Sequence, residues 1–170
     1  DDGPDPNWTP KILDILKQKN VRASFFIIGE NAQANPDLVR RILAEGHDVG
    51  NHTYTHPNLG DLPDSLVSLE INAVPIGIAQ TMGYVTVGLH VDPNDWLHPP
   101  AGTIVDRVIE QVTDPNPVIS GHVILLHDSG GDRSQTVAAL PRIIDSLRAK
   151  GYDFVPISEL AGLSRDQAMP

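Results

Sequence analysis

Segments with helical spacing of apolar residues alternate with short apolar runs along this chain. The first helical segment begins at Thr9-Pro10, where we expect the threonine hydroxyl to cap the helix before proline, and it ends at Asn20. A second begins at Asn35-Pro36 and ends at Gly46. Three further helices are predicted, over residues 76–82, 102–112 and 134–150.

The short apolar runs predict buried strands between these helices. They cover residues 23–28, 47–50, 85–89, 122–126 and 152–156. Strands that alternate with helices in this way indicate βα units around a parallel sheet or barrel, so the predicted fold class is α/β.

Polar side chains gather where the predicted strands end. In chain order they are Asp1 and Asp2, His52 and His56, Asp92 and Asp95, and His127 and Asp128. The first pair follows a strand only if one precedes Asp1, which we expect because the chain opens on a polar turn. Each pair alone is typical of an ordinary turn. In barrels of βα units the carboxyl ends of the strands carry the chemistry, so the pairs together indicate one site.

The residue types in these pairs favour metal-assisted hydrolysis. Two histidines four residues apart and one carboxylate make a three-ligand site that leaves positions open for water and substrate. The same ligands suit Fe²⁺, so the ligand set leaves the metal open. A bound divalent ion lowers the pKa of its water to about 7, and a second carboxylate can take the proton. His127 can protonate the leaving group while Asp95 holds its tautomer.

Composition narrows the partners and the chemistry. The 170 residues include 12 lysines and arginines against 22 aspartates and glutamates, a net charge of −10 at pH 7. This balance argues against nucleic acid or an anionic membrane as the main partner. The chain has no cysteine, which excludes disulfides, thiolate zinc sites and a cysteine nucleophile. No apolar run approaches the length of a transmembrane segment.

Four segments, in order along nearly the whole chain, resemble the motifs of the polysaccharide deacetylases. This family is also called the NodB-homology group, or carbohydrate esterase family 4. The segments are Asp-Asp-Gly-Pro at 1–4, His-Thr-Tyr-Thr-His-Pro at 52–57, Asp-Pro-Asn-Asp-Trp at 92–96 and Leu-Leu-His-Asp at 125–128. The resemblance implies a distorted (β/α) barrel. It also implies metal-dependent hydrolysis of N-acetyl groups on a polysaccharide containing N-acetylglucosamine.

The resemblance assigns Asp1 as the catalytic base. It assigns Asp2, His52 and His56 as the metal ligands. The implied cofactor is a divalent cation, with Zn²⁺ expected ahead of Co²⁺, Mn²⁺, Ni²⁺ or Fe²⁺. The implied partner is an N-acetylated glycan, and such substrates imply a secreted or cell-envelope location.

The remaining motifs supply the acid and the walls of the site. His127 matches the general acid, and Asp95 matches the carboxylate that partners it. Trp96 matches an indole that walls the site, and Leu125 matches the residue that lines the pocket for the acetyl methyl group.

One expected motif is absent from its place. The family's third motif, Arg-x-Pro-Tyr, belongs between the helix near Leu69 and the helix near Ile76, where this chain has neither an arginine nor that tyrosine. Either residues near 73–74 and before Asp1 are missing, which we favour, or the domain is degenerate. We therefore expect a catalytic domain over 1–163 that lacks a first strand and an internal segment. Residues 164–170 would begin a linker within a larger multidomain protein.

Two other functions stay open. One is a catalytically impaired glycan-binding module of the same fold, and the other is a metal hydrolase of non-sugar amide bonds. Among the other polar residues, we expect His47, His98 and His122 to be solvated. Asp128 is expected to fix a local turn beside His127.

Overall fold

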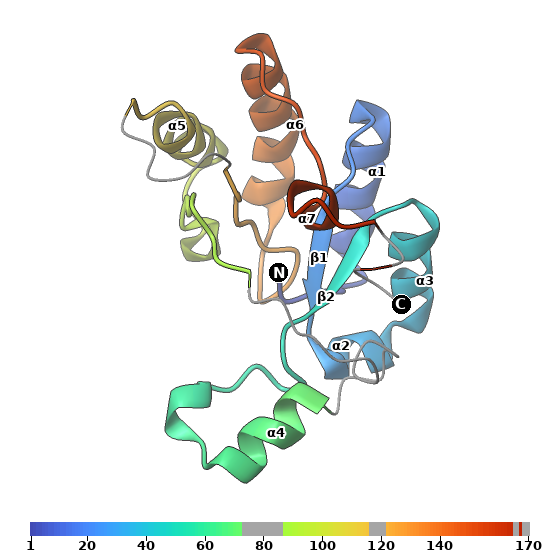
Figure 1. Cartoon of the computed structure of the whole chain (residues 1–170). Coiled ribbons are helices and arrows are strands. Elements are labelled where there is room, and N and C mark those ends of the chain that lie inside the picture. The colour runs from blue at the N-terminus through green and yellow to red at the C-terminus, as the bar shows by residue number, and fades with distance from the viewer. Residues whose placement is uncertain (73–86, 116–121, 165–166, 168–170) are drawn as a thin grey trace.

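The computed structural model describes residues 1–72, 87–115, 122–164 and 167 (Figure 1). The elements of the first half are α1 (Thr9–Lys19), β1 (Ser24–Ile27), α2 (Gly29–Ala34), α3 (Pro36–Ala44), β2 (Asp48–Asn51), the 3₁₀ turn η1 (Leu59–Asp61) and α4 (Asp64–Asn72). Those of the second half are the 3₁₀ turn η3 (Asp95–Leu97), α5 (Ala101–Val112), α6 (Ser134–Ala149) and α7 (Ile157–Leu160).

Strands β1 and β2 pair in parallel, with Ser24 opposite Asp48 and Ile27 opposite Asn51. Helices α2 and α3 make the crossover between them, which is the βα unit that the sequence predicts. Figure 1 shows the two strands side by side near the middle of the molecule, with α1 and α3 close to them. Helix α6 packs against both α1 and α5.

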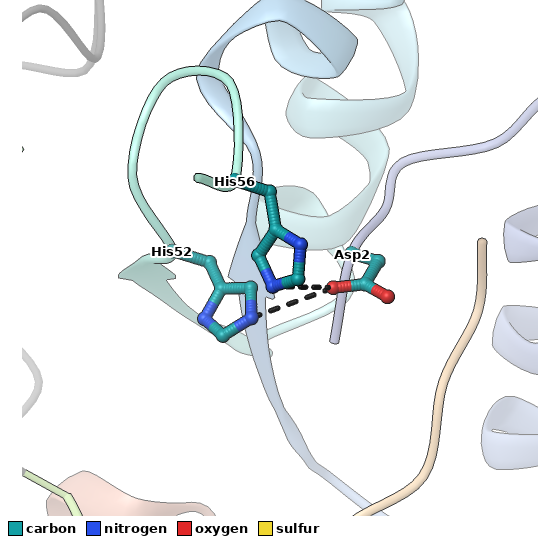
Figure 2. Close-up of side chains that lie close together, drawn as sticks. All are labelled: Asp2, His52 and His56. Atoms are coloured by element: carbon teal, nitrogen blue, oxygen red, sulfur yellow. Dashed lines mark ion pairs between the residues drawn. The ribbon is translucent and has the colours of Figure 1, made fainter. Parts of the chain in front are cut away.

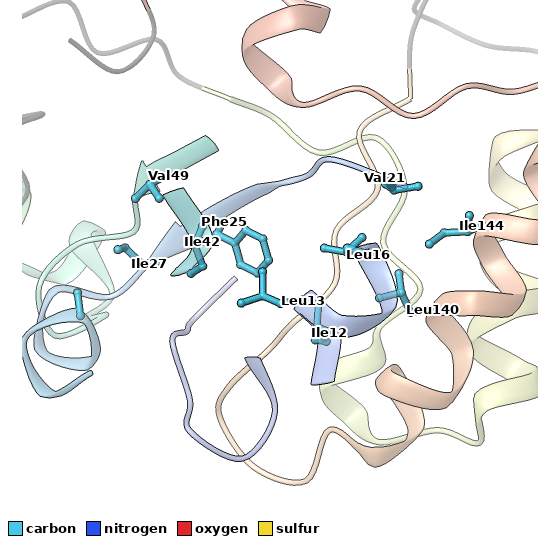
Figure 3. Packing of buried hydrophobic residues seen from close by; sticks show 11 residues of the cluster. Ile12, Leu13, Leu16, Val21, Phe25, Ile27, Ile42, Val49, Leu140 and Ile144 are labelled. Carbon is cyan, nitrogen blue, oxygen red and sulfur yellow. The ribbon is translucent and has the colours of Figure 1, made fainter. Parts of the chain in front are cut away.

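Apolar side chains from these elements form two clusters. The first joins α1, β1, β2, α3 and α6 and contains Leu13, Ile27 and Ile42, which are all fully buried (Figure 3). The second joins α5, α6 and Val91. Truncating such a residue to alanine typically costs about 2–5 kcal/mol of unfolding free energy, so these clusters hold the strand ends in place.

The N-terminal residues lie between the two halves of the chain. The main-chain nitrogen of Asp1 donates to the carbonyl oxygen of Leu126 at 2.7 Å. The N–H of Asp128 donates to the oxygen of Asp1 at 3.0 Å. On the other side, the N–H of Ile28 donates to the oxygen of Gly3 at 3.0 Å. The chain start is therefore fixed against the ends of two extended segments.

Most predicted helices are confirmed, and several strands are not. The short helix α2 was not expected from the sequence. Residues 122–126 form one isolated parallel bridge, Val91 to Ile124, and no strand is assigned over 87–89 or 152–156. A regular strand needs hydrogen bonds to consecutive residues of a neighbouring strand. Among the described residues, the segment 122–126 makes main-chain hydrogen bonds only around Val91 and at Asp1. The helix predicted over 76–82 and the start of the strand predicted at 85 lie outside the described residues.

Two smaller predictions are also wrong. His47 is buried rather than solvated: it is 2% exposed, its Nδ1 accepts the N–H of Ala23 and its ring meets Phe25 edge-on. The Thr9 hydroxyl does not cap α1. It accepts the N–H of Asp5 at 2.8 Å and donates to Asp128 at 2.5 Å. His98 is exposed, as expected, whereas His122 is half-buried against Tyr152.

Helix length and hydropathy also bear on membrane association. Within the described part of the chain, none of the helices has the length and apolar character needed to cross a bilayer.

Candidate metal and catalytic site

His52 and His56 stand on a turn that leaves the end of β2. The N–H of His52 still donates to the oxygen of Ile27, so this residue is held by the sheet. The side chain of Asn51 then accepts the N–H of Thr53, and the Thr53 hydroxyl accepts the N–H of His56. This turn brings both imidazoles to the same side, where they face the carboxylate of Asp2 (Figure 2).

The three predicted metal ligands converge on one point. Asp2 Oδ1 lies 3.4 Å from His52 Nε2 and 3.6 Å from His56 Nε2. Ligands held at about 2.0–2.2 Å from a tetrahedral zinc ion are roughly 3.3–3.6 Å apart, so both distances from Asp2 match, and the three ligand atoms all lie within 4.8 Å of one another. Among the described residues, Asp2 Oδ1 is a buried oxygen with no hydrogen-bond donor. A buried oxygen without a donor, facing two imidazole nitrogens, fits a divalent cation.

The surroundings of Asp2 favour its ionised form. Burial raises the pKa of this carboxyl group, but the adjacent His52 imidazole and the charges of His127 and His56 outweigh burial. The pKa of Asp2 is therefore held below its usual value, and the group is a carboxylate at neutral pH. A ligand must be deprotonated to bind a metal, and this one is.

Asp1 lies beside this cluster without joining it. Its Oδ2 is 3.9 Å from His52 Nε2, and its main chain is held by Leu126 and Asp128. Asp1 and His52 both line a cavity of about 250 Å³, and Leu125 lines the same cavity. The structure thus places the predicted base, a metal ligand and the predicted methyl-pocket residue around one space.

His127 and Asp95 form a buried pair. Asp95 is 1% exposed, and its Oδ1 lies 2.7 Å from His127 Nδ1. Its Oδ2 accepts the N–H of His127 and the hydroxyl of Thr136. An ionised carboxylate only accepts hydrogen bonds, so the proton of this contact sits on Nδ1 and leaves Nε2 for other chemistry.

Hydrogen bonds also set the ionisation of Asp95. Burial raises its pKa, but donation from the His127 ring and N–H and from Thr136 outweighs burial and holds the pKa below its usual value. A carboxylate that stays ionised here orients the imidazole at neutral pH.

Trp96 does not join the cavities that the structure describes. It follows Asp95 in η3, where Asp95 turns inward and Trp96 outward, and its side chain is 48% exposed. It lines neither the cavity of about 250 Å³ at Asp1 and His52 nor a second cavity, of about 210 Å³, at Asp1 and His127. Its role as a wall of the site stays a prediction.

Three polar residues support the site through contacts that were not predicted from the sequence. The prediction that Asp128 fixes a turn beside His127 is wrong, because its carboxylate accepts the N–H of Gly3 and the hydroxyl of Thr9. Arg133 is 2% exposed and donates to the carbonyl groups of Ser129 and Gly130. Glu70 accepts main-chain N–H groups between the two histidines. Their partners are mostly main-chain groups, which leave no signal in residue spacing.

The family model for polysaccharide deacetylase matches residues 1–115. The chain belongs to the polysaccharide deacetylase family. A peptidoglycan-N-acetylglucosamine deacetylase of Bacillus cereus is 39% identical in an alignment of 186 positions, gaps included, that covers 94% of this chain and 84% of the relative.

Solved structures of polysaccharide deacetylases share the fold. A peptidoglycan N-acetylglucosamine deacetylase, in complex with 4-naphthalen-1-yl-N-oxidanyl-benzamide, has a TM-score of 0.82 at 34% identity, covering 96% of this chain and 86% of that chain. A family 4 acetyl xylan esterase from Clostridium thermocellum, in complex with a cobalt ion, has a TM-score of 0.80 at 29% identity, covering 96% and 90%. The predicted fold class, a distorted (β/α) barrel, is confirmed.

The polysaccharide deacetylase family also includes a relative without activity. A carbohydrate esterase family 4 pseudoenzyme from Bacillus anthracis has a TM-score of 0.74 at 28% identity, covering 91% of this chain and 60% of that chain. The family's third motif, which is absent from its expected place in this chain, is relevant to whether the chain is active. Residues 70–72 belong to α4, and residues 73–86 lie outside the described part of the chain.

Proposed function

We propose that this chain is a divalent-metal-dependent deacetylase that removes N-acetyl groups from a polysaccharide containing N-acetylglucosamine. The observation that carries the proposal is the convergence of Asp2, His52 and His56 on one point beside Asp1. The name of the Bacillus cereus relative supports the substrate class.

The three ligands would hold a cation such as Zn²⁺, and the cobalt ion in the acetyl xylan esterase supports a metal in this family. A divalent cation at this site supplies Lewis-acid polarisation of the acetamide carbonyl group and of the attacking water. The rest of the reaction falls to the side chains of the protein.

Asp1 accepts the proton that the water loses as its oxygen bonds to the acetamide carbon. His127, as an imidazolium with a proton on each ring nitrogen, donates the Nε2 proton to the sugar nitrogen as the carbon–nitrogen bond breaks, which releases acetate and a free amine. Asp95 holds the His127 ring in the tautomer that presents Nε2. Asp1 and His127 both line the adjoining cavity of about 210 Å³.

Two apolar residues would receive the sugar. Leu125 lines the cavity at Asp1 and His52, which suits an acetyl methyl group. Trp96 presents an exposed indole next to Asp95, and an exposed indole suits stacking on a sugar ring. The polysaccharide substrates named for the relatives lie outside the cytoplasm, so we propose a secreted or cell-envelope location.

Acetate release tests the proposal. The purified chain is loaded with Zn²⁺ and incubated with acetylated chito-oligosaccharide and with peptidoglycan. We expect acetate from at least one of them and none from the His127→Ala variant. The control is Asp106→Asn, an exposed position on α5.

A second candidate, a glycan-binding module without catalysis, is favoured by the pseudoenzyme relative and by the missing third motif. Zinc binding and glycan retention without acetate release would establish that candidate. Acetate release from a non-sugar N-acetyl amide, with none from either glycan, would establish the other hydrolase function.

A further inference from the structure

Asp128 carries a buried carboxylate that the proposed reaction does not use. Its side chain is 4% exposed, and its two oxygens accept from two different parts of the N-terminal segment. Oδ1 accepts the N–H of Gly3 at 3.1 Å, and Oδ2 accepts the hydroxyl of Thr9 at 2.5 Å. An ionised group this far from solvent is costly unless its oxygens are engaged.

Main-chain hydrogen bonds with Leu126 and Asp128 hold Asp1 in place. The N–H of Asp128 donates to the oxygen of Asp1 at 3.0 Å, and the oxygen of Leu126 accepts the nitrogen of Asp1 at 2.7 Å. The Thr9 hydroxyl extends the network by accepting the N–H of Asp5 at 2.8 Å. Asp128 thus makes hydrogen bonds with three of the first nine residues, Asp1, Gly3 and Thr9.

The segment so held contains a strained residue. Asp2 has φ of 71°, a left-handed conformation that costs free energy for residues with a Cβ atom. Its carbonyl oxygen accepts the side-chain amide of Asn31, and the neighbouring Gly3 is fixed through both its N–H and its oxygen. A Cβ atom at Gly3 would lie 2.2 Å from Asp128 Oδ2, so the carboxylate packs directly on this backbone.

We infer that Asp128 is a positioning residue that holds Asp1 and Asp2 in the geometry that the metal cluster requires. His127 and Asp128 share a peptide bond, so the same segment fixes the proposed acid against the proposed base. Asp1, at the start of the chain, and His127, far along it, are thereby held in a fixed relative position. This inference rests on the proposed metal-dependent function.

Metal affinity tests the role of Asp128 apart from catalysis. Zn²⁺ affinity is measured by competition with a chelator, and the absorption spectrum of bound Co²⁺ reports the ligand geometry. We expect Asp128→Ala to weaken Zn²⁺ binding by about tenfold or more and to alter the Co²⁺ spectrum, since residues that orient metal ligands typically contribute about 10–100-fold. Asp128→Asn keeps an oxygen for Gly3, so we expect it to recover most of the affinity.

Asp48→Ala is the matched control. Asp48 is also a buried carboxylate, 7% exposed, and its Oδ2 accepts from Ser24 and Ser158 rather than from the N-terminal segment. Both alanine variants should lower the melting temperature, and only Asp128→Ala should change the metal site. If Asp128→Ala does not fold, Thr9→Val, which removes one donor, should weaken Zn²⁺ binding by about threefold.

The inference is overturned if Asp128→Ala, or Thr9→Val in its place, binds Zn²⁺ with the affinity of the wild type. It is equally overturned if Asp48→Ala weakens binding as much as Asp128→Ala does, or if the wild type binds no divalent cation. A wild-type chain that binds Zn²⁺ and releases no acetate refutes the proposed function alone, because the role of Asp128 is read from metal affinity.

Discussion

At the scale of single residues, the ionised carboxylate of Asp95 links stability to chemistry. The carboxylate accepts from His127 twice and from Thr136 once, and it is almost fully buried. Because the pKa of Asp95 is lower in the folded chain than its usual value in the unfolded chain, the ionised form stabilises the fold above that usual value. This stabilisation is lost as the pH falls through the lowered pKa.

Asp95→Asn should therefore be less stable than the wild type at pH 7, by about 1.5–3 kcal/mol for the lost charged hydrogen bonds. The difference should shrink as the pH falls below about 4, because the carboxylate becomes protonated first in the unfolded chain and then, at the lowered pKa, in the folded chain. Acetate release should fall by at least about 100-fold, since the amide no longer fixes the His127 tautomer. Urea unfolding at pH 7 and pH 3, with exposed Asp106→Asn as the control, measures the first effect. A stability difference that is constant with pH would contradict it.

Some site residues could be predicted from the sequence and others could not, because the two groups have different hydrogen-bond partners. Asp1, Asp2, His52, His56, Asp95 and His127 could be predicted because each follows a predicted strand and carries a side chain with metal or acid–base chemistry. Asp128 and Glu70 act mainly on main-chain N–H groups, and every non-proline residue has one. Spacing along the sequence therefore carries no signal for these contacts, although Asp128 itself is among the polar residues that follow predicted strands.

At the scale of elements, α4 holds the loop that carries the histidine ligands. Glu70, in its last turn, accepts the N–H groups of Tyr54 and Thr55 at 3.0 and 2.8 Å, and also the Thr55 hydroxyl. The oxygen of Ile71 accepts the side chain of Asn51 at 2.7 Å. The hydrogen bonds from Thr55 and Tyr54 hold the pKa of Glu70 below its usual value, so the contact persists in mild acid.

We predict that Glu70→Ala weakens Zn²⁺ binding by about three- to tenfold, because the turn between His52 and His56 loses three hydrogen bonds at once. Chelator competition measures the change. Glu110→Ala, at an exposed position on α5, is the control and should bind as the wild type does. Equal affinities for Glu70→Ala and Glu110→Ala would show that α4 does not position the loop.

At the scale of the whole molecule, two extended segments, β1 and residues 123–126, line one cavity. Ala23 and Ile27 direct their oxygens to β2, so Ser24 and Phe26 direct their main-chain groups to the other side. Val123 and Leu125 bond to the Val91 region, so Ile124 and Leu126 face away from it. This cavity of about 210 Å³, lined mostly by apolar residues, lies between the two segments.

We propose that this space accepts one further parallel strand, as the sequence predicts for residues before Asp1. Asp1 already pairs in that direction with Leu126 and Asp128. A chain extended before Asp1 by five alternating valine and threonine residues should melt at least about 5 °C higher, because each apolar side chain buried contributes about 1.5–3 kcal/mol. The same extension with prolines in place of threonines is the control, and an equal gain from both would contradict the proposal.

The α/β class could be predicted because alternating strands and helices are visible as periodicity, whereas the barrel followed from the resemblance to the polysaccharide deacetylases. The pairing of 122–126 and 152–156 could not be predicted, since a ladder depends on a neighbouring strand rather than on the segment itself. The predicted internal deletion near 73–74 lies outside the described residues. The Bacillus cereus relative aligns over 186 positions against 170 residues here, so it has residues where this chain has none. The missing segment near 73–74 stays a prediction.

The central claim is that Asp2, His52 and His56 hold a divalent cation. The most direct measurement is the amount of zinc bound per chain, after zinc loading and dialysis, for the wild type, His52→Ala and His98→Ala. His98 is exposed, and its ring contacts the oxygen of Asp132, so it controls for the loss of a histidine elsewhere. The account predicts one ion for the wild type and for His98→Ala, and almost none for His52→Ala. Full zinc occupancy in His52→Ala would contradict it.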